Sequence, residues 1–237
     1  MKAIKRFILF ILILILIVVL GVTGYGYLYY KQTISKTPLD TKINDIRSEF
    51  TYVKKGQLPD YYLNAVVAVE DRRFYSHGPV DFIGIVRAIA SNIRQQSLKE
   101  GGSTITQQLA ENLYYINHDD PVKRKIAEGF TAIDLEKKYS KDEILELYTN
   151  IIYFGNGYYG IREACEGYLK KKVEDMNLAE AAMLAGLPNA PSAYSPLSNK
   201  ELCKSRTEKV LRSLLNNNYI TQEQYDSIDL SFIDEIN

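Results

Sequence analysis

One stretch near the N-terminus, residues 7–30, constrains this chain more than any other because it contains no charged residue. As a helix it would be roughly 36 Å long, at 1.5 Å per residue. The hydrocarbon core of a bilayer is roughly 30 Å thick. The sequence therefore predicts one transmembrane signal-anchor helix over residues 7–30.

The residues on either side of this stretch predict its orientation. Lys2, Lys5 and Arg6 precede it, and basic residues favour the cytoplasmic side of a membrane. We expect residues 1–6 to form a cytoplasmic tail and everything after Lys31 to lie outside. Four tyrosines at the outer end predict an interfacial aromatic belt: Tyr25, Tyr27, Tyr29 and Tyr30.

A cleaved signal peptide is the alternative to an anchor. Its apolar core would be shorter, and a small-residue A-x-A cleavage site would follow it. No such site follows residue 30, which favours the uncleaved anchor.

The remainder of the 237 residues leaves room for one domain of ordinary size. The formal net charge is +0, which argues against nucleic acid as a partner. Cys165 and Cys203 are too few for a disulfide framework and lack the spacing of metal ligands. We expect both to be small buried side chains.

The region after the anchor is expected to begin with a tether over residues 31–44, within a polar segment that is irregular or extended up to Gly56. The domain is expected over residues 45–237, with its core wholly after Lys31. Apolar periodicity and capping signals predict a mainly α domain. The predicted helices are 60–70, 82–97, one from about residue 105 capped by Ser103, 123–138, 141–150, 161–172, 178–187, 200–216 and 222–228.

The segment EDRRFYSHGPVD, residues 70–81, holds the first candidate for catalysis. Glu70 follows the apolar run 63–69, where a buried helix meets an exposed segment. Partial burial would raise the pKa of this carboxylate and suit it to proton transfer near neutral pH. The alternative is an ordinary helix end with its charges in solvent.

The segment EGGSTITQQL, residues 100–109, holds a second set of candidates. Ile105, Leu109 and Leu113 form the core stripe of a helix, and Thr104, Gln108 and Glu111 lie on another face. Threonine and glutamine at this density indicate contacts with sugar or phosphate. The alternative is a solvated polar stripe.

The segment 123–138 is predicted to turn Ile126, Phe130 and Ile133 inward. It also places Arg124 and Glu128 four residues apart. On its own this pair would be an exposed ion pair that contributes little to stability.

Together, these blocks resemble the peptidoglycan glycosyltransferases, glycosyltransferase family 51. The resemblance covers roughly residues 45–230 and rests on five segments in the family's order: EDRRFYSH, GGSTITQQL, RKIAE, KYSKDEILELYTNIIYFGNGYYGI and LAEAAMLAGLPNAPSAYSP. It implies a lysozyme-like helical fold with a smaller membrane-proximal lobe. No serine motif of a transpeptidase is present, so the chain is expected to be a monofunctional member.

The resemblance implies that the chain polymerises lipid II into glycan strands for cell-wall synthesis. The reaction would be an inverting glycosyl transfer that releases polyprenyl diphosphate. By position, Glu70 resembles the general base, and Glu128 resembles the second essential acid, near the pyrophosphate or a cation. The implied substrate-binding residues are Asp71, Phe74, His77, Thr104, Gln107, Gln108, Arg124 and Lys125.

The resemblance implies no obligatory cofactor and no dedicated metal ligands, although Mg²⁺ or Mn²⁺ is a candidate for the pyrophosphate. The implied partners are lipid II, the growing glycan strand, the bacterial cytoplasmic membrane and other cell-wall synthesis proteins, with no nucleic acid. The chain is expected to be a single-pass bacterial membrane protein with its catalytic domain outside the cytoplasm.

Two departures from the family concern the pyrophosphate. Glu111 stands where the family usually has a lysine, and Asp119 with Asp120 makes a usually basic loop acidic. Lys99, Lys123, Arg124 or a divalent cation could supply the missing charge. If the site is otherwise ordinary, Glu111→Lys should raise lipid II affinity; if Glu111 pairs with Lys123 or Arg124 or holds a cation, the same change should damage activity. Gly78-Pro79 is a third departure, in the loop after the histidine.

These departures leave three functions open. The first is an active lipid II polymerase. The second is a weak or inactive member that acts as a lipid II-binding or cell-wall-synthesis scaffold, which Glu111 and the acidic loop favour. The third is a lysozyme-like hydrolase, which the anchor and GGSTITQQL oppose.

Overall fold

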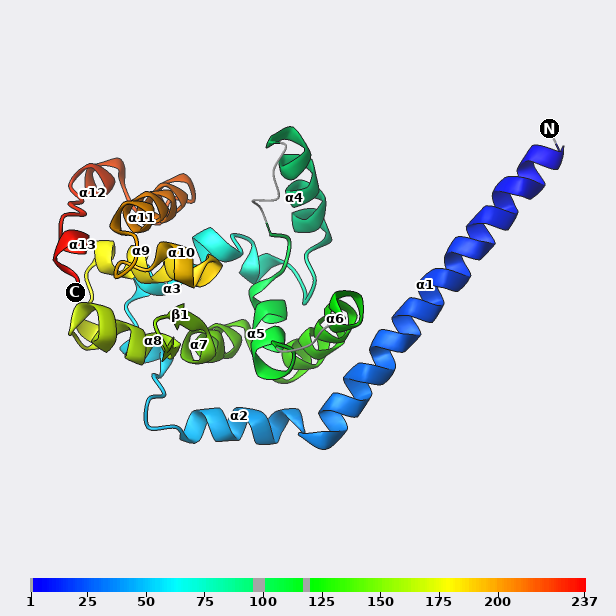
Figure 1. Ribbon diagram of the computed structural model, residues 1–237, viewed down its shortest axis with the longest axis horizontal. Coiled ribbons are helices and arrows are strands. Elements are labelled where there is room, and N and C mark those ends of the chain that lie inside the picture. Colours follow the sequence, from blue (N-terminus) through cyan, green and yellow to red (C-terminus); the bar gives the residue numbers. More distant parts are fainter. Residues whose placement is uncertain (1, 96–100, 117–119) are drawn as a thin grey trace.

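The computed structural model describes residues 2–95, 101–116 and 120–237. Figure 1 shows one long N-terminal helix, α1 (Lys2–Lys36), extending away from a helical domain. It is long and apolar enough to cross a membrane, and its side chains from Phe7 to Leu20 are exposed. The predicted mainly α fold is confirmed, and α1 is a candidate for the predicted N-terminal transmembrane helix.

The C-terminal part of α1 packs against α6 (Pro121–Lys138). The rings of Tyr27 and Tyr30 contact the ring of Phe130, and the hydroxyl of Tyr30 donates a hydrogen bond to Asp134. Tyr30 is only 6% exposed. The expectation that the core lies wholly after Lys31 is therefore wrong.

Two further expectations change because α1 covers one side of α6. Ile126 and Phe130, expected to face the domain core, lie on the face that α1 contacts, where Ile126 closely approaches Gly26. Lys123 lies over the rings of Tyr25 and Tyr29, 4.9 and 4.4 Å from their centres. The tyrosines near the C-terminal end of α1 thus pack this helix onto α6.

The segment expected to be a tether and irregular chain is largely helical. α1 continues to Lys36, and α2 spans Leu39–Ser48. The break falls at Pro38, which has no N–H to continue a helix. Leu39 and Ile43 lie four residues apart and are buried in the core, so α2 packs as part of the domain.

The other elements follow in a largely helical chain, with one small hairpin. They are η1 (Lys55–Gln57), α3 (Asp60–Glu70), η2 (Phe74–Ser76), α4 (Phe82–Gln95), α5 (Ile105–Tyr114), α7 (Lys141–Ile151), β1 (Tyr153–Gly155), β2 (Tyr158–Tyr159), α8 (Gly160–Ala164), η3 (Cys165–Leu169), η4 (Val173–Asp175), α9 (Leu178–Gly186), η5 (Leu187–Asn189), α10 (Pro191–Tyr194), α11 (Lys200–Asn216), α12 (Gln222–Asp226) and α13 (Phe232–Glu235).

The core is organised around α9, which packs against both α3 and α11. Its alanines allow the close approach that its sequence predicts, and Gly186 leaves room for the Arg206 side chain of α11. Cys165 and Cys203 are buried and free, as expected. This packing holds the C-terminal end of α3 against α11.

Side-chain caps mark the starts of several helices. The capping boxes predicted at Ser140 and Asn177 are present. At α5 the cap is Thr104 instead of Ser103, because Thr104 accepts the Gln107 N–H and closes a capping box with it. The helix predicted over 161–172 is shorter: α8 passes into a π-helical turn that ends before Lys170, which has a positive φ of 55°.

Helix α4 stands apart from the other helices in Figure 1. The structure confirms this helix to Gln95, and the rest of its predicted span lies outside the described residues. Its apolar face is exposed: Phe82, Val86, Ile89 and Ile93 are each at least half exposed. In the described chain, this face is not part of the protein core.

Candidate active site

A cavity of about 690 Å³ lies between α3, α4, α5 and α11. Two predicted site residues, Glu70 at the end of α3 and Gln108 on α5, line it. Glu111, Ser103 and Arg206 also reach its wall. The cavity therefore joins the first two sequence blocks with a residue from α11 that the sequence reading did not single out.

The Glu70 carboxylate is held on both oxygens. Gln108 Nε2 donates to Glu70 Oε2 over 3.1 Å, and Arg206 Nη2 donates to Oε1 over 3.3 Å. Tyr148 in turn donates to Gln108 Oε1 over 3.1 Å, which fixes the orientation of the amide. Glu70 is therefore a positioned carboxylate in a cavity wall and not a solvated helix end.

The pKa of Glu70 is raised above its usual value. Burial is the largest cause, because it disfavours the charged form, and Asp71 adds repulsion. The hydrogen bond from Gln108 and the charges of Arg206 and Lys209 act in the opposite direction without cancelling the effect of burial. A carboxylate with a raised pKa is a stronger base for a hydroxyl proton.

Arg206 is the main site residue missed from the sequence. It is 6% exposed, and its Nε donates to the Gly186 carbonyl over 2.9 Å. In the α11 sequence it lies among the buried positions Cys203, Val210 and Leu214. An arginine on the core stripe of an amphipathic helix was the available signal, because such a charge needs a partner.

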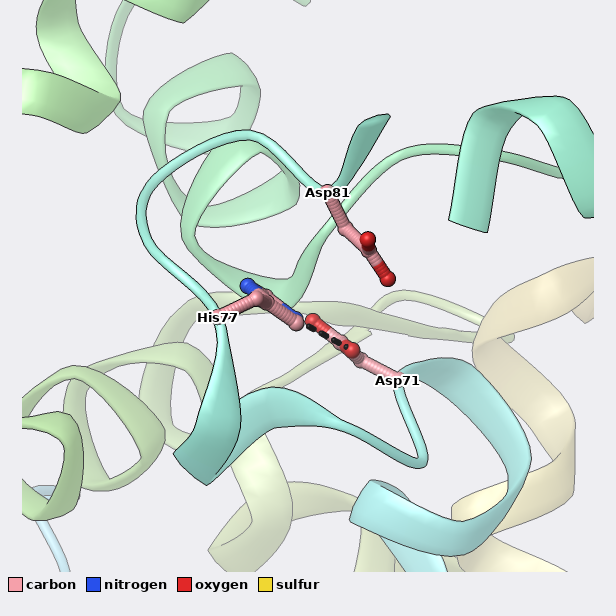
Figure 2. Close-up of side chains that lie close together, drawn as sticks. All are labelled: Asp71, His77 and Asp81. Carbon is pink, nitrogen blue, oxygen red and sulfur yellow. Dashed lines mark hydrogen bonds and ion pairs between the residues drawn. The ribbon is translucent and has the colours of Figure 1, made fainter. Parts of the chain in front are cut away.

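Asp71, the residue after Glu70, forms a brace with His77, and Figure 2 shows their side chains close together. Asp71 Oδ1 lies 2.7 Å from His77 Nε2, and Oδ2 accepts the Ile105 N–H over 3.1 Å. His77 Nδ1 lies 2.6 Å from the Gly78 carbonyl. The brace ties the end of α3 to the start of α5, which carries Gln108.

Asp81 completes a cluster with Asp71 and His77 in which one potential ligand atom from each lies within 4.8 Å of the others. Asp81 is paired with Arg73 and accepts the Gly84 N–H over 2.9 Å. Burial tends to raise the pKa of Asp81, but these partners outweigh it and the pKa is lowered. Since the guanidinium already balances this carboxylate, we interpret the cluster as a structural brace and not as a metal centre.

Phe74, Thr104 and Gln107 have structural surroundings. Phe74 is 0% exposed in the core, where no ligand can reach it in this conformation. Thr104 is 2% exposed, caps α5 and donates to the Pro79 carbonyl over 2.8 Å; Gln107 closes the capping box. In the structure these three side chains pack and cap, and their contacts with substrate stay a prediction. The bond to Pro79 also fixes the loop in which Gly78-Pro79 departs from the family.

Glu128 is fully buried on α6, which corrects the expectation of an exposed pair with Arg124. Lys125 Nζ donates to Glu128 Oε2 over 2.7 Å and to Ser103 Oγ over 2.7 Å. Arg124 Nε lies 3.4 Å from Oε1. Burial raises the pKa of Glu128, opposed by Lys125 and Arg124 and increased by Glu111. Ser103 connects this cluster to the cavity.

Glu111 pairs with Arg124, whose Nη1 lies 3.0 Å from Glu111 Oε1. Arg124 is therefore shared between Glu111 and Glu128. Asp120 caps α6 by accepting the N–H groups of Val122 and Lys123. Lys123, one of the cations considered for the pyrophosphate, is directed at the anchor tyrosines; Lys99 and Asp119 lie outside the described residues.

These features define a helical protein with an N-terminal helix long and apolar enough to cross a membrane and a buried carboxylate in a large cavity. The comparisons with known proteins identify the family. The Transglycosylase family model matches residues 38–215, so the chain belongs to that family. The predicted resemblance to peptidoglycan glycosyltransferases is confirmed at this level.

Individual relatives are similar over the same region. Penicillin-binding protein 1A of Neisseria lactamica is 48% identical over 180 residues, which are 76% of this chain and 22% of that protein. Penicillin-binding protein 1A of Aquifex aeolicus is 44% identical over 175 residues, 74% of this chain and 24% of that protein. This chain thus spans less than a quarter of the length of either relative.

Among the solved structures that match is penicillin-binding protein 1A from Haemophilus influenzae. It has a TM-score of 0.44 and 25% identity, covering 74% of this chain and 16% of that one.

Proposed function

We propose that this chain polymerises lipid II into peptidoglycan glycan strands, with Glu70 as the general base. The observation that supports this most directly is the Glu70 carboxylate, held by Gln108 and Arg206 in a cavity wall with a raised pKa. A glycosyl acceptor is a hydroxyl, so its attack requires a base within hydrogen-bond reach.

The reaction balances without an external reagent. The acceptor hydroxyl oxygen attacks the anomeric carbon of the donor sugar as its proton passes to Glu70. The bond between that carbon and the diphosphate oxygen breaks, and its electron pair leaves with the polyprenyl diphosphate. Attack opposite the leaving group inverts the anomeric configuration.

The leaving diphosphate needs positive charge. Arg124 and Lys125 are the cations nearest Glu128, and both are engaged with carboxylates. Under this proposal they would have to exchange Glu111 or Glu128 for the diphosphate as the donor binds. A divalent cation such as Mg²⁺ or Mn²⁺ remains a proposed aid to that exchange.

The anchor would place this chemistry at the membrane. We propose a single-pass topology with the N-terminus in the cytoplasm, because Lys2, Lys5 and Arg6 flank α1 on that side. The domain would then lie outside the cytoplasmic membrane of a bacterium, next to a lipid-linked substrate. Lipid II, the growing strand and other cell-wall synthesis proteins are the proposed partners.

A second candidate, a weak polymerase that acts as a lipid II-binding scaffold, is favoured by one observation. Glu111 occupies Arg124, and Asp120 places another acid at the start of α6. Acids at these positions reduce the net positive charge available to a diphosphate.

Incubation of the full-length protein in detergent with lipid II, and separately with finished peptidoglycan, tests these functions. The polymerase predicts glycan polymer from lipid II and no fragments from peptidoglycan. Lipid II binding without polymer would favour the scaffold, and fragments would indicate a hydrolase. Parallel reactions with excess magnesium and with chelator show whether a divalent cation is needed.

A further inference from the structure

The cavity around Glu70 contains more positive than negative charge. Four exposed cations line it: Arg72, Arg87, Arg94 and Lys209. Among the described residues, none of the four has a carboxylate within ion-pairing distance. The acids of the wall are Glu70, which Arg206 holds, and Glu111, which Arg124 holds. The four cations are therefore available to an anionic ligand.

This arrangement differs from that on α6. There Arg124 lies between Glu111 and Glu128, and Lys125 contacts Glu128 at 2.7 Å. A diphosphate that bound α6 would have to displace a carboxylate from each of these cations. On the cavity wall no such exchange is needed, because the guanidinium groups of α4 already face open space.

Helix α4 also presents two neighbouring faces of different chemistry. Arg87, Ser91 and Arg94 line the cavity at helical spacing, and Phe82, Val86, Ile89 and Ile93 are exposed on the adjoining face. An anionic group on a long apolar chain matches both faces, since its charge meets the arginines while its chain stays against the apolar face. A small hydrophilic anion would leave the apolar face unexplained.

We propose that the α4 wall of this cavity, Arg87 and Arg94 with Arg72 and Lys209, binds the diphosphate of a polyprenyl-linked sugar whose hydroxyl lies at Glu70. This inference rests on the proposed function, because it places the acceptor substrate of that reaction. It gives the chain a diphosphate subsite on α4 and α11, separate from the ion-paired cations of α6. The same chemistry could come from a phospholipid headgroup, so the test separates the two.

The test measures binding of farnesyl diphosphate to the full-length protein in neutral detergent micelles by calorimetry. The variant is Arg87→Gln/Arg94→Gln. The matched control is Lys137→Gln/Arg212→Gln, which removes the same charge from side chains that are 70% and 65% exposed and do not line the cavity. Circular dichroism checks that all three proteins are folded. Bilayer nanodiscs of phosphatidylglycerol and of phosphatidylcholine form the phospholipid arm.

We expect Kd for farnesyl diphosphate to rise at least about tenfold in the cavity variant and to stay within about twofold in the control. Equal weakening in both variants, no weakening in the cavity variant, or no binding by the wild type would overturn the subsite. If the two substitutions weaken binding to phosphatidylglycerol nanodiscs as much as they weaken binding to farnesyl diphosphate, the arginines bind the membrane surface. That result would also overturn the subsite.

The polymerisation assay separates this inference from the proposed function. If farnesyl diphosphate binding depends on the two arginines but no polymer forms from lipid II, the subsite proposal stands and the polymerase proposal fails. If the wild type makes polymer from lipid II, but the cavity variant shows unchanged farnesyl diphosphate binding and unchanged KM, the polymerase proposal stands and the subsite proposal fails.

Discussion

The ion pair between Glu111 and Arg124 makes a specific prediction about the substitution Glu111→Lys. The two charges lie 3.0 Å apart, and at an effective dielectric constant of 20 their attraction is about 5.5 kcal/mol. Their side chains are 29% and 28% exposed, so solvent screening and lost side-chain entropy reduce the net contribution to about 1 kcal/mol. The pair therefore contributes little to the free energy of unfolding, but it determines the direction of the Arg124 side chain.

Glu111→Lys should lower the free energy of unfolding by about 2 kcal/mol, because about 1 kcal/mol of attraction becomes a repulsion of similar size. Glu111→Gln should lose only about 1 kcal/mol. Guanidinium denaturation of the full-length protein in detergent, followed by circular dichroism, measures both. The initial rate of lipid II consumption should fall in Glu111→Lys, since a lysine beside Arg124 would displace it from Glu128. This reverses the expectation for an otherwise ordinary site.

A double-mutant cycle with Arg124→Gln isolates the pair, and its coupling should be about 1 kcal/mol. Glu49→Lys is the control, because Glu49 is exposed and outside the cavity. If Glu111→Lys is as stable as the wild type and consumes lipid II faster, the pair does not position Arg124. A cation at this position would then serve the diphosphate directly.

Three further predictions follow from the contacts of the site and the anchor. Arg206→Gln should shift the acidic limb of the pH profile of kcat/KM to higher pH than in the wild type, because Arg206 lowers the pKa of Glu70. Arg206→Lys should shift the limb less, and an identical limb in the wild type and both variants would contradict the role of Arg206. Removal of residues 1–30 should lower the thermal midpoint relative to removal of residues 1–22, which keeps the tyrosines that pack on α6; equal midpoints would show that this packing adds no stability. Thr104→Ala should lower the unfolding free energy by about 1 kcal/mol through loss of a cap, with KM for lipid II unchanged. A raised KM at unchanged stability would instead show that Thr104 contacts substrate.

Local patterns in the sequence predicted much of this fold. Apolar periodicity placed α3 with Glu70 at its end, and the capping boxes at Ser140 and Asn177 marked the starts of α7 and α9. These features depend on residues within about one helical turn of each other. For the same reason, the stripe of Ile105 and Leu109 is buried as predicted.

The missed features depend on contacts between distant segments. Nothing near Tyr30 in the sequence shows that it packs on α6, and the sequence left open whether Glu111 pairs with Lys123, with Arg124 or with a cation. Arg206 reaches Glu70 across a sequence separation of 136 residues. Such partners are set by how helices pack, which periodicity alone does not determine.

Turnover of lipid II by Glu70→Gln tests the central claim most directly. Its matched control is Glu180→Gln, a carboxylate that is also buried and paired with a cation, Lys171 at 2.6 Å, but lies outside the cavity. Glutamine keeps the size of Glu70 but cannot accept the proton, so turnover should fall by about 10²–10⁴, with folding intact and the control within a few-fold of wild type. Near wild-type turnover in a folded Glu70→Gln protein would contradict the assignment of Glu70 as the base.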